Sequence, residues 1–203
     1  MNNRKLPMLT IIFVLVISFW MPGKWHNSLL RAAEPTEKLG LKKPRLQEIE
    51  PVLKKILPPA TEFKESRYLC CKDCLVDYLG FYKGKKAGII CLFKIEGQWG
   101  PMMLMMGVNM DGEITHIELS YHTETPGCGS QVDRRPFMDQ FKGKTLQDPI
   151  EIYKDLLEAT DAVKGVDCIT RATVSSRAIA KGVKEQLKTM AEYYLSGNED
   201  AWR

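Results

Sequence analysis

A group of hydroxyl side chains stands directly before the last helical pattern of the chain, in the segment DCITRATVSSRA. One interpretation is that Thr173, Ser175 or Ser176 caps this helix by accepting hydrogen bonds from the unpaired amides of its first turn. The other is that the segment holds an anion, because a helix N-terminus attracts negative charge and Arg171 offers donors that fit a phosphate. The hydroxyl of Thr170 would add a further hydrogen bond, and the phosphate could esterify one of these hydroxyls. Both interpretations stay open at this point.

A second polar segment, HTETPGCG, lies upstream at residues 122–129. Its Thr-Pro-Gly sequence is a turn signal, since proline fixes φ and Gly127 supplies a positive φ. Such a turn can aim Glu124 and Thr125, through side chains or backbone amides, at the polar edge of a ring system. His122 opens the loop and is a further candidate for the same contact.

Taken together, the two segments resemble the FMN-binding domain found in the G subunits of Rnf-type electron-transport complexes and in the C subunits of sodium-translocating NADH:quinone reductases. That domain carries a His-x-Glu-Thr-Pro-Gly-Leu-Gly loop, and Cys128 stands here in the Leu place. It also carries an Asp-x-x-Ser/Thr-Gly-Ala-Thr motif, which is matched here by Asp167, Thr170, Ala172 and Thr173. Arg171 replaces the family glycine, a residue that can mark a positive φ or a close backbone approach. The resemblance covers about residues 75–195 and the N-terminal anchor.

The resemblance implies that a flavin transferase joins FMN through a phosphoester to Thr173. The residues around the ester would then be Thr170, Arg171, Ala172, Ser175 and Ser176. It also implies an electron-transfer subunit of a membrane-bound ion-translocating oxidoreductase, whose partners are the other membrane subunits of the complex. Trp99 lies at a turn before a strand, where it either stacks on the flavin or is a partly buried aromatic residue.

Two other classes of function stay open. One is a membrane-anchored FMN-binding regulator, and the other is an exported domain stabilised by disulfides or a metal, in which TRATVSS only caps a helix. The chain has no dinucleotide-binding glycine fingerprint and no nucleophile elbow, so it is not expected to be a complete enzyme alone. The formal net charge of +4, without a long basic block, gives no reason to expect nucleic acid.

The chain has 6 cysteines, and three of them form the cluster CCKDC at residues 70–74. In an exported domain an even number permits disulfides, but the sequence cannot choose among the pairings. Leu75 follows the Cys-x-x-Cys, so this is not a c-type haem site. No metal ligands are assigned, because a metal site would need a fourth ligand that no second Cys-x-x-Cys supplies. A disulfide, free structural thiols, and a metal or redox role all stay open for the cluster.

The N-terminus has the pattern of an export signal or a membrane anchor. After Arg4 and Lys5, no charged residue occurs between Leu6 and Gly23. As a helix this run would span about 27 Å, close to the hydrocarbon core of a bilayer at roughly 30 Å. The small pair Ala32-Ala33 lies too far along for a good cleavage site, so an uncleaved single-pass anchor is favoured over a cleaved signal. We expect the inner membrane, with the domain on the periplasmic side. The basic residues after the run, counted alone, favour the opposite topology.

The elements that must position these motifs follow from periodicity. Four apolar or alternating runs, separated by short Gly/Asn/Asp connections, predict antiparallel strands at residues 75–84, 87–95, 101–108 and 113–122. The methionine-rich run PMMLMMGV is expected to pack in a core rather than bind copper. His116 falls on the fourth strand as a surface or packing residue.

Helical segments complete an α+β domain in which helices pack against the antiparallel sheet. Short helices are expected around Pro136–Phe141 and near Ile152–Leu157. The last helix carries a core-facing stripe, made of Ile179, Val183, Leu187, Met190 and Tyr194. The predicted division is an anchor at 1–26, a partly helical stem at 27–60, in which Pro51 breaks or starts the helix, and the FMN-binding domain at 61–203.

Overall fold

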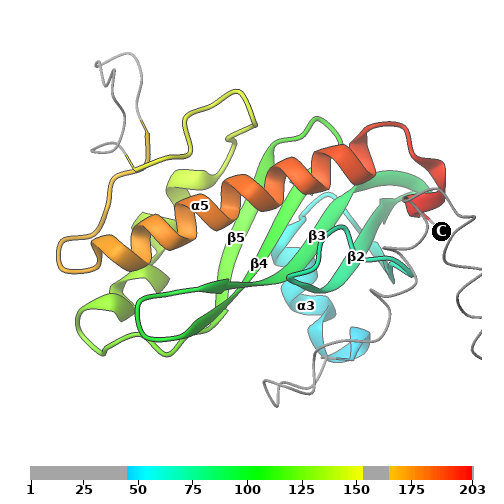
Figure 1. Ribbon diagram of the computed structural model, residues 1–203. Coiled ribbons are helices and arrows are strands. Elements are labelled where there is room, and N and C mark those ends of the chain that lie inside the picture. The colour runs from blue at the N-terminus through cyan, green and yellow to red at the C-terminus, as the bar shows by residue number, and fades with distance from the viewer. Residues whose placement is uncertain (1–44, 153–164, 203) are drawn as a thin grey trace, which may run out of the picture.

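The computed structural model describes residues 45–152 and 165–202, which form a five-stranded antiparallel sheet with helices on both faces (Figure 1). Each strand pairs with its neighbour along the chain, so the order is β1-β2-β3-β4-β5. The strands are β1 (Glu62–Glu65), β2 (Cys74–Tyr82), β3 (Lys85–Glu96), β4 (Pro101–Asn109) and β5 (Ile114–Tyr121). The predicted α+β class and antiparallel sheet are confirmed.

The four predicted strands correspond to β2, β3, β4 and β5. Strand β1 was not predicted, because its sequence Glu-Phe-Lys-Glu has a single apolar residue and no recognisable strand pattern. It forms by pairing with β2, where Glu62 lies opposite Phe81 and Glu65 opposite Tyr78. Tertiary pairing, rather than local propensity, therefore defines this edge of the sheet.

Helix α5 (Thr173–Met190) lies across one face of the sheet and continues into a π-helical turn, η6 (Ala191–Leu195) (Figure 1). The predicted stripe is buried in full, and its members are Ile179, Val183, Leu187, Met190 and Tyr194. The stripe packs in the larger of two cores with the sheet residues that point to the same side. Gly182 permits close approach to β3, since a Cβ there would lie 2.4 Å from Ile95 Cγ2.

Helix α3 (Leu46–Ile56) covers the opposite face of the sheet. Its residues Leu53 and Ile56 are fully buried in a second core, with Tyr78 of β2 and Ile90 of β3. The helix predicted in the stem is therefore found, and Pro51 lies inside it without ending it. Helix α3 therefore packs on the sheet as a layer of the folded domain and does not only connect the domain to the preceding residues.

The methionine-rich strand β4 is buried on both of its sides. Met102 and Met106 face the core under α5, whereas Met103 and Met105 face the core under α3. Alternation along the strand thus places these thioethers in two separate apolar layers. They pack as core residues, as expected.

The remaining described elements are short. They are η3 (Gly129–Asp133), α4 (Arg135–Met138), η4 (Asp139–Phe141) and the C-terminal η7 (Glu199–Trp202). The predicted helix around Pro136–Phe141 is confirmed as α4 and η4. The predicted helix near Ile152–Leu157 and the N-terminal anchor lie mostly or wholly outside the described residues. Within the described ranges, no helix is both long enough and apolar enough to cross a membrane.

Candidate functional site

The side chain of Glu124 joins three segments at the end of the molecule where α5 begins. Its Oε1 accepts hydrogen bonds from the amides of Gln98 (2.8 Å) and Trp99 (3.2 Å), and its Oε2 accepts one from the hydroxyl of Ser175 (2.5 Å). Glu124 is only 4% exposed and Ser175 is fully buried. Charge-assisted bonds of this kind are stronger than neutral ones, and here they hold a carboxylate that would otherwise be costly to bury. The two motifs identified in the sequence therefore meet at Glu124.

Two glycines leave the space that this carboxylate occupies. A Cβ built on Gly97 would lie 2.3 Å from Glu124 Oε1, and one on Gly129 would lie 2.4 Å from Glu124 Oε2. Gly129 is the last residue of HTETPGCG, and a side chain at this position would collide with Glu124. This steric limit explains why a glycine ends the motif. Gly127 has a different role, because its φ of 75° is the positive φ that the turn signal predicts.

The first turn of α5 has no side-chain cap, and Ala172 occupies the N-cap position. Ser175 bonds Glu124 instead, and the hydroxyl of Ser176 accepts a bond from the amide of Ile169 (3.3 Å). The capping interpretation of Thr173, Ser175 and Ser176 is therefore wrong. The serines hold the motif in place, and the first-turn amides of α5 lack helical carbonyl partners, as in any α-helix.

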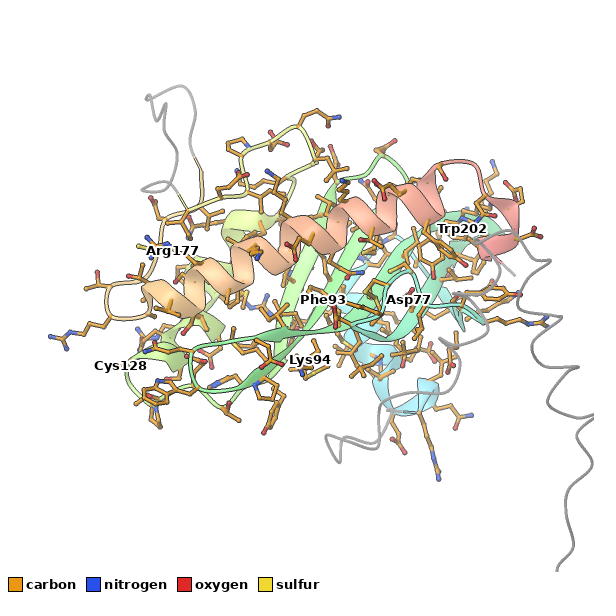
Figure 2. All side chains as sticks on the ribbon, viewed as in Figure 1. Asp77, Phe93, Lys94, Cys128, Arg177 and Trp202 are labelled. Carbon is orange, nitrogen blue, oxygen red and sulfur yellow. A yellow bond between two sulfur atoms is a disulfide. The ribbon has the colours of Figure 1, made fainter. Side chains whose placement is uncertain are left out.

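Thr173 is the first residue of α5 and is half-buried beside the exposed Val174. Among the described residues, its hydroxyl has no hydrogen-bond partner. Arg177 lies one turn further along, on the same side of the helix, and was not identified from the sequence although the i, i+4 spacing gives it. Figure 2 shows Arg177 and Cys128 at this end of the molecule, with Trp202 at the other. A free hydroxyl, helix amides and nearby cationic side chains make this a chemically suitable place for a phosphoester.

Arg171 adopts the backbone conformation that glycine favours, with a φ of 68°. A left-handed residue with a Cβ is unfavourable by about 1–2 kcal/mol. The turn of the motif is thus retained with arginine at this position, and both Thr170 and Arg171 are exposed. The preceding segment is anchored by Gln140, a residue that the sequence did not single out. Its amide accepts a bond from the Asp167 N–H (2.7 Å) and donates one to the Asp167 carbonyl (3.2 Å).

The remaining predicted site residues surround Glu124. The indole of Trp99 is 64% exposed, so it is not a partly buried aromatic but a free ring beside the site. His122 accepts a hydrogen bond through Nδ1 from the Glu124 amide (3.2 Å), so it supports the loop. Thr125 is exposed at the turn and its carbonyl accepts bonds from the amides of Cys128 and Ser130. Within the described residues, the structure shows no hydrogen bond or ion pair between Thr170 or Arg171 and this loop.

Comparison with known proteins finds a family to which part of this chain is similar. Residues 97–188 match the family described as FMN-binding domain, a stretch that begins at Gly97 and includes both motifs and most of α5. The resemblance inferred from the two motifs is thereby confirmed.

Curated relatives point the same way. The chain is 30% identical over 58% of its length to the G subunit of the proton-translocating ferredoxin:NAD(+) oxidoreductase complex of Clostridium ljungdahlii, of which it covers 61%. It is 32% identical over 66% of its length to the G subunit of the ion-translocating oxidoreductase complex of Aliivibrio fischeri, of which it covers 65%. The chain thus spans less than two thirds of the length of these relatives. Among solved structures, the C subunit of the Na(+)-translocating NADH-quinone reductase of Parabacteroides distasonis is 20% identical with a TM-score of 0.46, covering 61% of this chain and 63% of that one.

Proposed function

We propose that this chain carries FMN covalently, through a phosphoester to the Thr173 hydroxyl, as the flavin subunit of a membrane-bound ion-translocating oxidoreductase. The single observation that carries the proposal is the hydrogen bond between Glu124 and Ser175. It brings the HTETPGCG loop to the first turn of the helix on which Thr173 stands, and both lie within the region that matches the FMN-binding domain.

The residues present fit the cofactor. Thr173 offers a half-buried hydroxyl without a partner among the described residues, and the amides of the first turn of α5 can bind phosphate oxygens. Arg171 and Arg177 supply positive charge on either side of Thr173 in the sequence. Trp99 has an exposed side chain that could stack on a planar group, and its backbone amide donates a hydrogen bond to Glu124.

Bound FMN would supply one- and two-electron chemistry, which no side chain of this site provides. The protein's part is positional. Glu124 fixes the loop at 97–100 against α5, Ser175 fixes the register of the first turn, and the covalent bond at Thr173 keeps the cofactor at an exposed site. Because Thr173 and Trp99 both face solvent in part, a redox partner could approach the ring without opening the core.

Mass spectrometry of the full chain, co-expressed with a flavin transferase, tests the proposal. We expect the protein to gain the mass of one FMN moiety, and we expect Thr173→Ala to lose it completely. Thr170→Ala is the matched control, since it removes a neighbouring exposed hydroxyl and should keep the adduct. An unmodified wild-type mass, or an adduct that persists in Thr173→Ala, would overturn the proposal.

We further propose that the chain acts at the cytoplasmic (inner) membrane, anchored by residues 1–26 with its folded domain outside, together with other membrane subunits of the complex. The names of the curated relatives, which are subunits of ion-translocating complexes, support this proposal. Fractionation tests it: the chain should stay in the membrane pellet after alkaline carbonate, and its domain should be digested by protease added to spheroplasts. Release by carbonate, or protection from the protease, would contradict the anchor or the topology respectively.

A further inference from the structure

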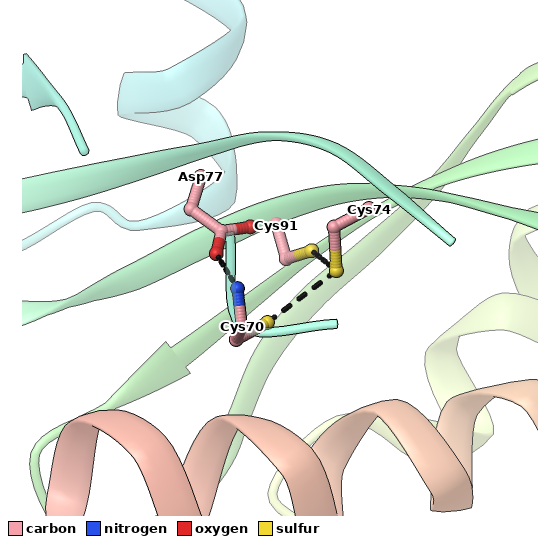
Figure 3. Close-up of side chains that lie close together, drawn as sticks. All are labelled: Cys70, Cys74, Asp77 and Cys91. Atoms are coloured by element: carbon pink, nitrogen blue, oxygen red, sulfur yellow. Dashed lines mark hydrogen bonds between the residues drawn. The ribbon is translucent and has the colours of Figure 1, made fainter. Parts of the chain in front are cut away.

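Four cysteine side chains from two segments of the chain converge where α5 passes over β2 and β3. Cys71 and Cys74 form a disulfide, and the sulfur of Cys74 also lies 3.4 Å from that of Cys70 and 3.2 Å from that of Cys91. Cys70, Cys74 and Cys91 are buried, whereas Cys71 is half-buried. Figure 3 shows the three buried sulfur atoms pointing at one another between β2, β3 and the loop before β2. The disulfide expected as one alternative is thus present, with two free thiols beside it.

Asp77 of β2 adds a carboxylate to this cluster. Its Oδ2 accepts hydrogen bonds from the amide of Cys70 (2.8 Å) and the hydroxyl of Tyr194 (2.7 Å). Its Oδ1 is buried and has no hydrogen-bond partner among the described residues. A buried carboxylate oxygen without a partner is costly unless something binds it.

The arrangement has the shape of a ligand set. One ligand atom from each of Cys70, Cys74, Asp77 and Cys91 can be chosen so that all lie within 4.8 Å of one another. In a tetrahedral site with metal–sulfur bonds of about 2.3 Å, neighbouring sulfurs are about 3.8 Å apart. The observed spacings of 3.2 and 3.4 Å are close to that value, so one ion can be shared by the three sulfurs after a small expansion.

Gln186 of α5 supports these sulfurs from the helix side. Its Nε2 lies 3.0 Å from Cys70 Sγ, 3.3 Å from Cys74 Sγ and 3.2 Å from Cys91 Sγ, so its two N–H groups are within hydrogen-bonding distance of all three sulfurs. Donation to sulfur stabilises a thiolate more than a thiol, and outer-shell bonds of this kind orient metal ligands. Gln186 is buried, so a polar side chain occupies a core-facing position of α5.

We propose that Cys70, Cys74, Cys91 and Asp77 bind one thiophilic divalent cation of the zinc class when the Cys71–Cys74 disulfide is reduced. Three sulfur ligands select a soft or borderline ion over Mg²⁺ or Ca²⁺. In the oxidised form the sulfur of Cys74 is bonded to Cys71 and cannot act as a thiolate ligand. The Cys71–Cys74 disulfide therefore prevents this cluster from binding the metal, and reduction makes binding possible. This inference is independent of flavin binding.

The chemistry balances with one external reductant. A trialkylphosphine gives two electrons to the disulfide, becoming the phosphine oxide with oxygen from water, and the two sulfurs take up two protons as thiols. Binding of the cation then displaces one proton from each of the three ligand thiols. The loop before β2 carries the half-buried Cys71 of the disulfide, and its exposed residues are Arg67, Tyr68, Lys72 and Asp73.

Titration of the purified full chain with Co²⁺ tests the proposal. The protein is freed of metal with a chelator, reduced with the phosphine and titrated without oxygen. We expect one Co²⁺ per chain, with sulfur-to-metal charge-transfer absorption and the intense visible bands of a tetrahedral site, both displaced by one Zn²⁺. The untreated oxidised protein should bind no Co²⁺ with these bands. Absence of the bands in the reduced protein would overturn the proposal.

Variants assign the ligands. Cys91→Ala keeps a small apolar side chain in the core and should abolish the charge-transfer bands, whereas Cys128→Ser, a change at a half-buried free cysteine elsewhere, should keep them. Asp77→Asn should weaken Zn²⁺ binding while changing the visible bands, and Gln186→Ala should weaken it about 10-fold or more. Unchanged binding by Cys91→Ala would contradict the assignment.

A measurement on the wild-type protein covers the case in which Cys91→Ala does not fold. Reduced protein is alkylated with and without one equivalent of Zn²⁺, and the modified cysteines are identified by mass spectrometry. Zn²⁺ should protect Cys70, Cys74 and Cys91 and leave the labelling of Cys128 unchanged. Equal labelling of all cysteines with and without Zn²⁺ would overturn the proposal.

Discussion

The carboxylate of Glu124 lies 2.5 Å from the hydroxyl of Ser175, and this contact joins two segments that are far apart in the sequence. Glu124 follows the last strand of the sheet, whereas Ser175 lies in the first turn of the last long helix. The same carboxylate binds the loop that carries Trp99. One buried side chain therefore fixes the relative positions of all three segments proposed to surround the flavin.

Loss of Glu124 should uncouple these segments. Glu124→Ala leaves the Ser175 hydroxyl and two backbone amides without an acceptor, so we expect the free energy of unfolding to fall by about 2–4 kcal/mol. Urea denaturation of Glu124→Ala, Ser175→Ala and the double variant gives the coupling energy, which should be about 1–2 kcal/mol. Strictly additive single effects would show that the hydrogen bond contributes nothing.

Gly129→Ala should disturb the same contact by sterics. Its new Cβ would meet Glu124 Oε2 at 2.4 Å, and the carboxylate cannot withdraw without losing its bonds. We expect a loss of about 1–3 kcal/mol in unfolding free energy, as for other overpacked sites. We also expect Ser175→Ala to lower the unfolding free energy less in the Gly129→Ala protein than in the wild type. Gly127→Ala is the control, because it meets no atom within 4 Å and only strains the backbone. The coupling between Glu124 and Ser175 should remain in the Gly127→Ala protein. If both alanine variants kept the coupling, the steric explanation would be wrong.

Arg171→Gly should stabilise the protein. Arginine at a φ of 68° costs about 1–2 kcal/mol relative to a residue that adopts this conformation freely. Glycine removes this strain, but it also raises the conformational entropy of the unfolded chain, which offsets part of the stabilisation. We expect the unfolding free energy to rise by about 0.5–1 kcal/mol. Arg171→Ala removes the charge but keeps the strain, so it should give no gain. A glycine variant no more stable than the alanine variant would show that the turn is unstrained.

The pH dependence of stability should contain a contribution from His116. Its Nε2 accepts a hydrogen bond from Arg135 (2.5 Å), and partial burial together with this cation lowers the pKa of His116 below its usual value. On acidification the folded protein therefore binds fewer protons at His116 than the unfolded chain does. The contribution of His116 to the free energy of unfolding is fully present above about pH 6.5 and is lost as the pH falls toward the folded pKa. Urea denaturation at pH 7.5 and pH 5 should show a smaller loss for His116→Gln than for the wild type.

Other groups around His116 do not obscure this comparison. Glu118 is next to it in space, and although partial burial raises the pKa of Glu118, the ion pair with Lys55 and the charge of Arg135 lower it overall. Glu118 therefore titrates below the chosen pH range. Equal losses for the two proteins would mean that His116 does not titrate differently on folding.

The periodicity of the sequence predicted most of the fold. Alternation and short turns indicated β2 to β5, and the spacing of Ile179 through Tyr194 indicated the buried face of α5, because these signals are local. Strand β1 was missed because it depends on a partner strand. The packing of α3 on the sheet was missed for a related reason: an amphipathic helix shows that it has a partner but does not identify it.

The candidate site could be predicted in part. Both motifs were found, but the bond from Glu124 to Ser175 was not, since a hydroxyl near a helix start is equally consistent with a cap. The cysteine cluster was harder still. Cys91, Asp77 and Gln186 have no sequence spacing that relates them to CCKDC, and only the pairing of β2 with β3 and the packing of α5 bring them together.

The order of the elements along the chain has a consequence for biogenesis. Each of the strands β2 to β5 pairs with the strand synthesised just before it, and the helix that bears Thr173 comes after all five. During translation the sheet can assemble as it emerges, whereas the proposed acceptor site is complete only when the final helix has docked. An attachment enzyme that reads that docked surface would therefore act on a finished domain, and flavin loading would report that folding has ended.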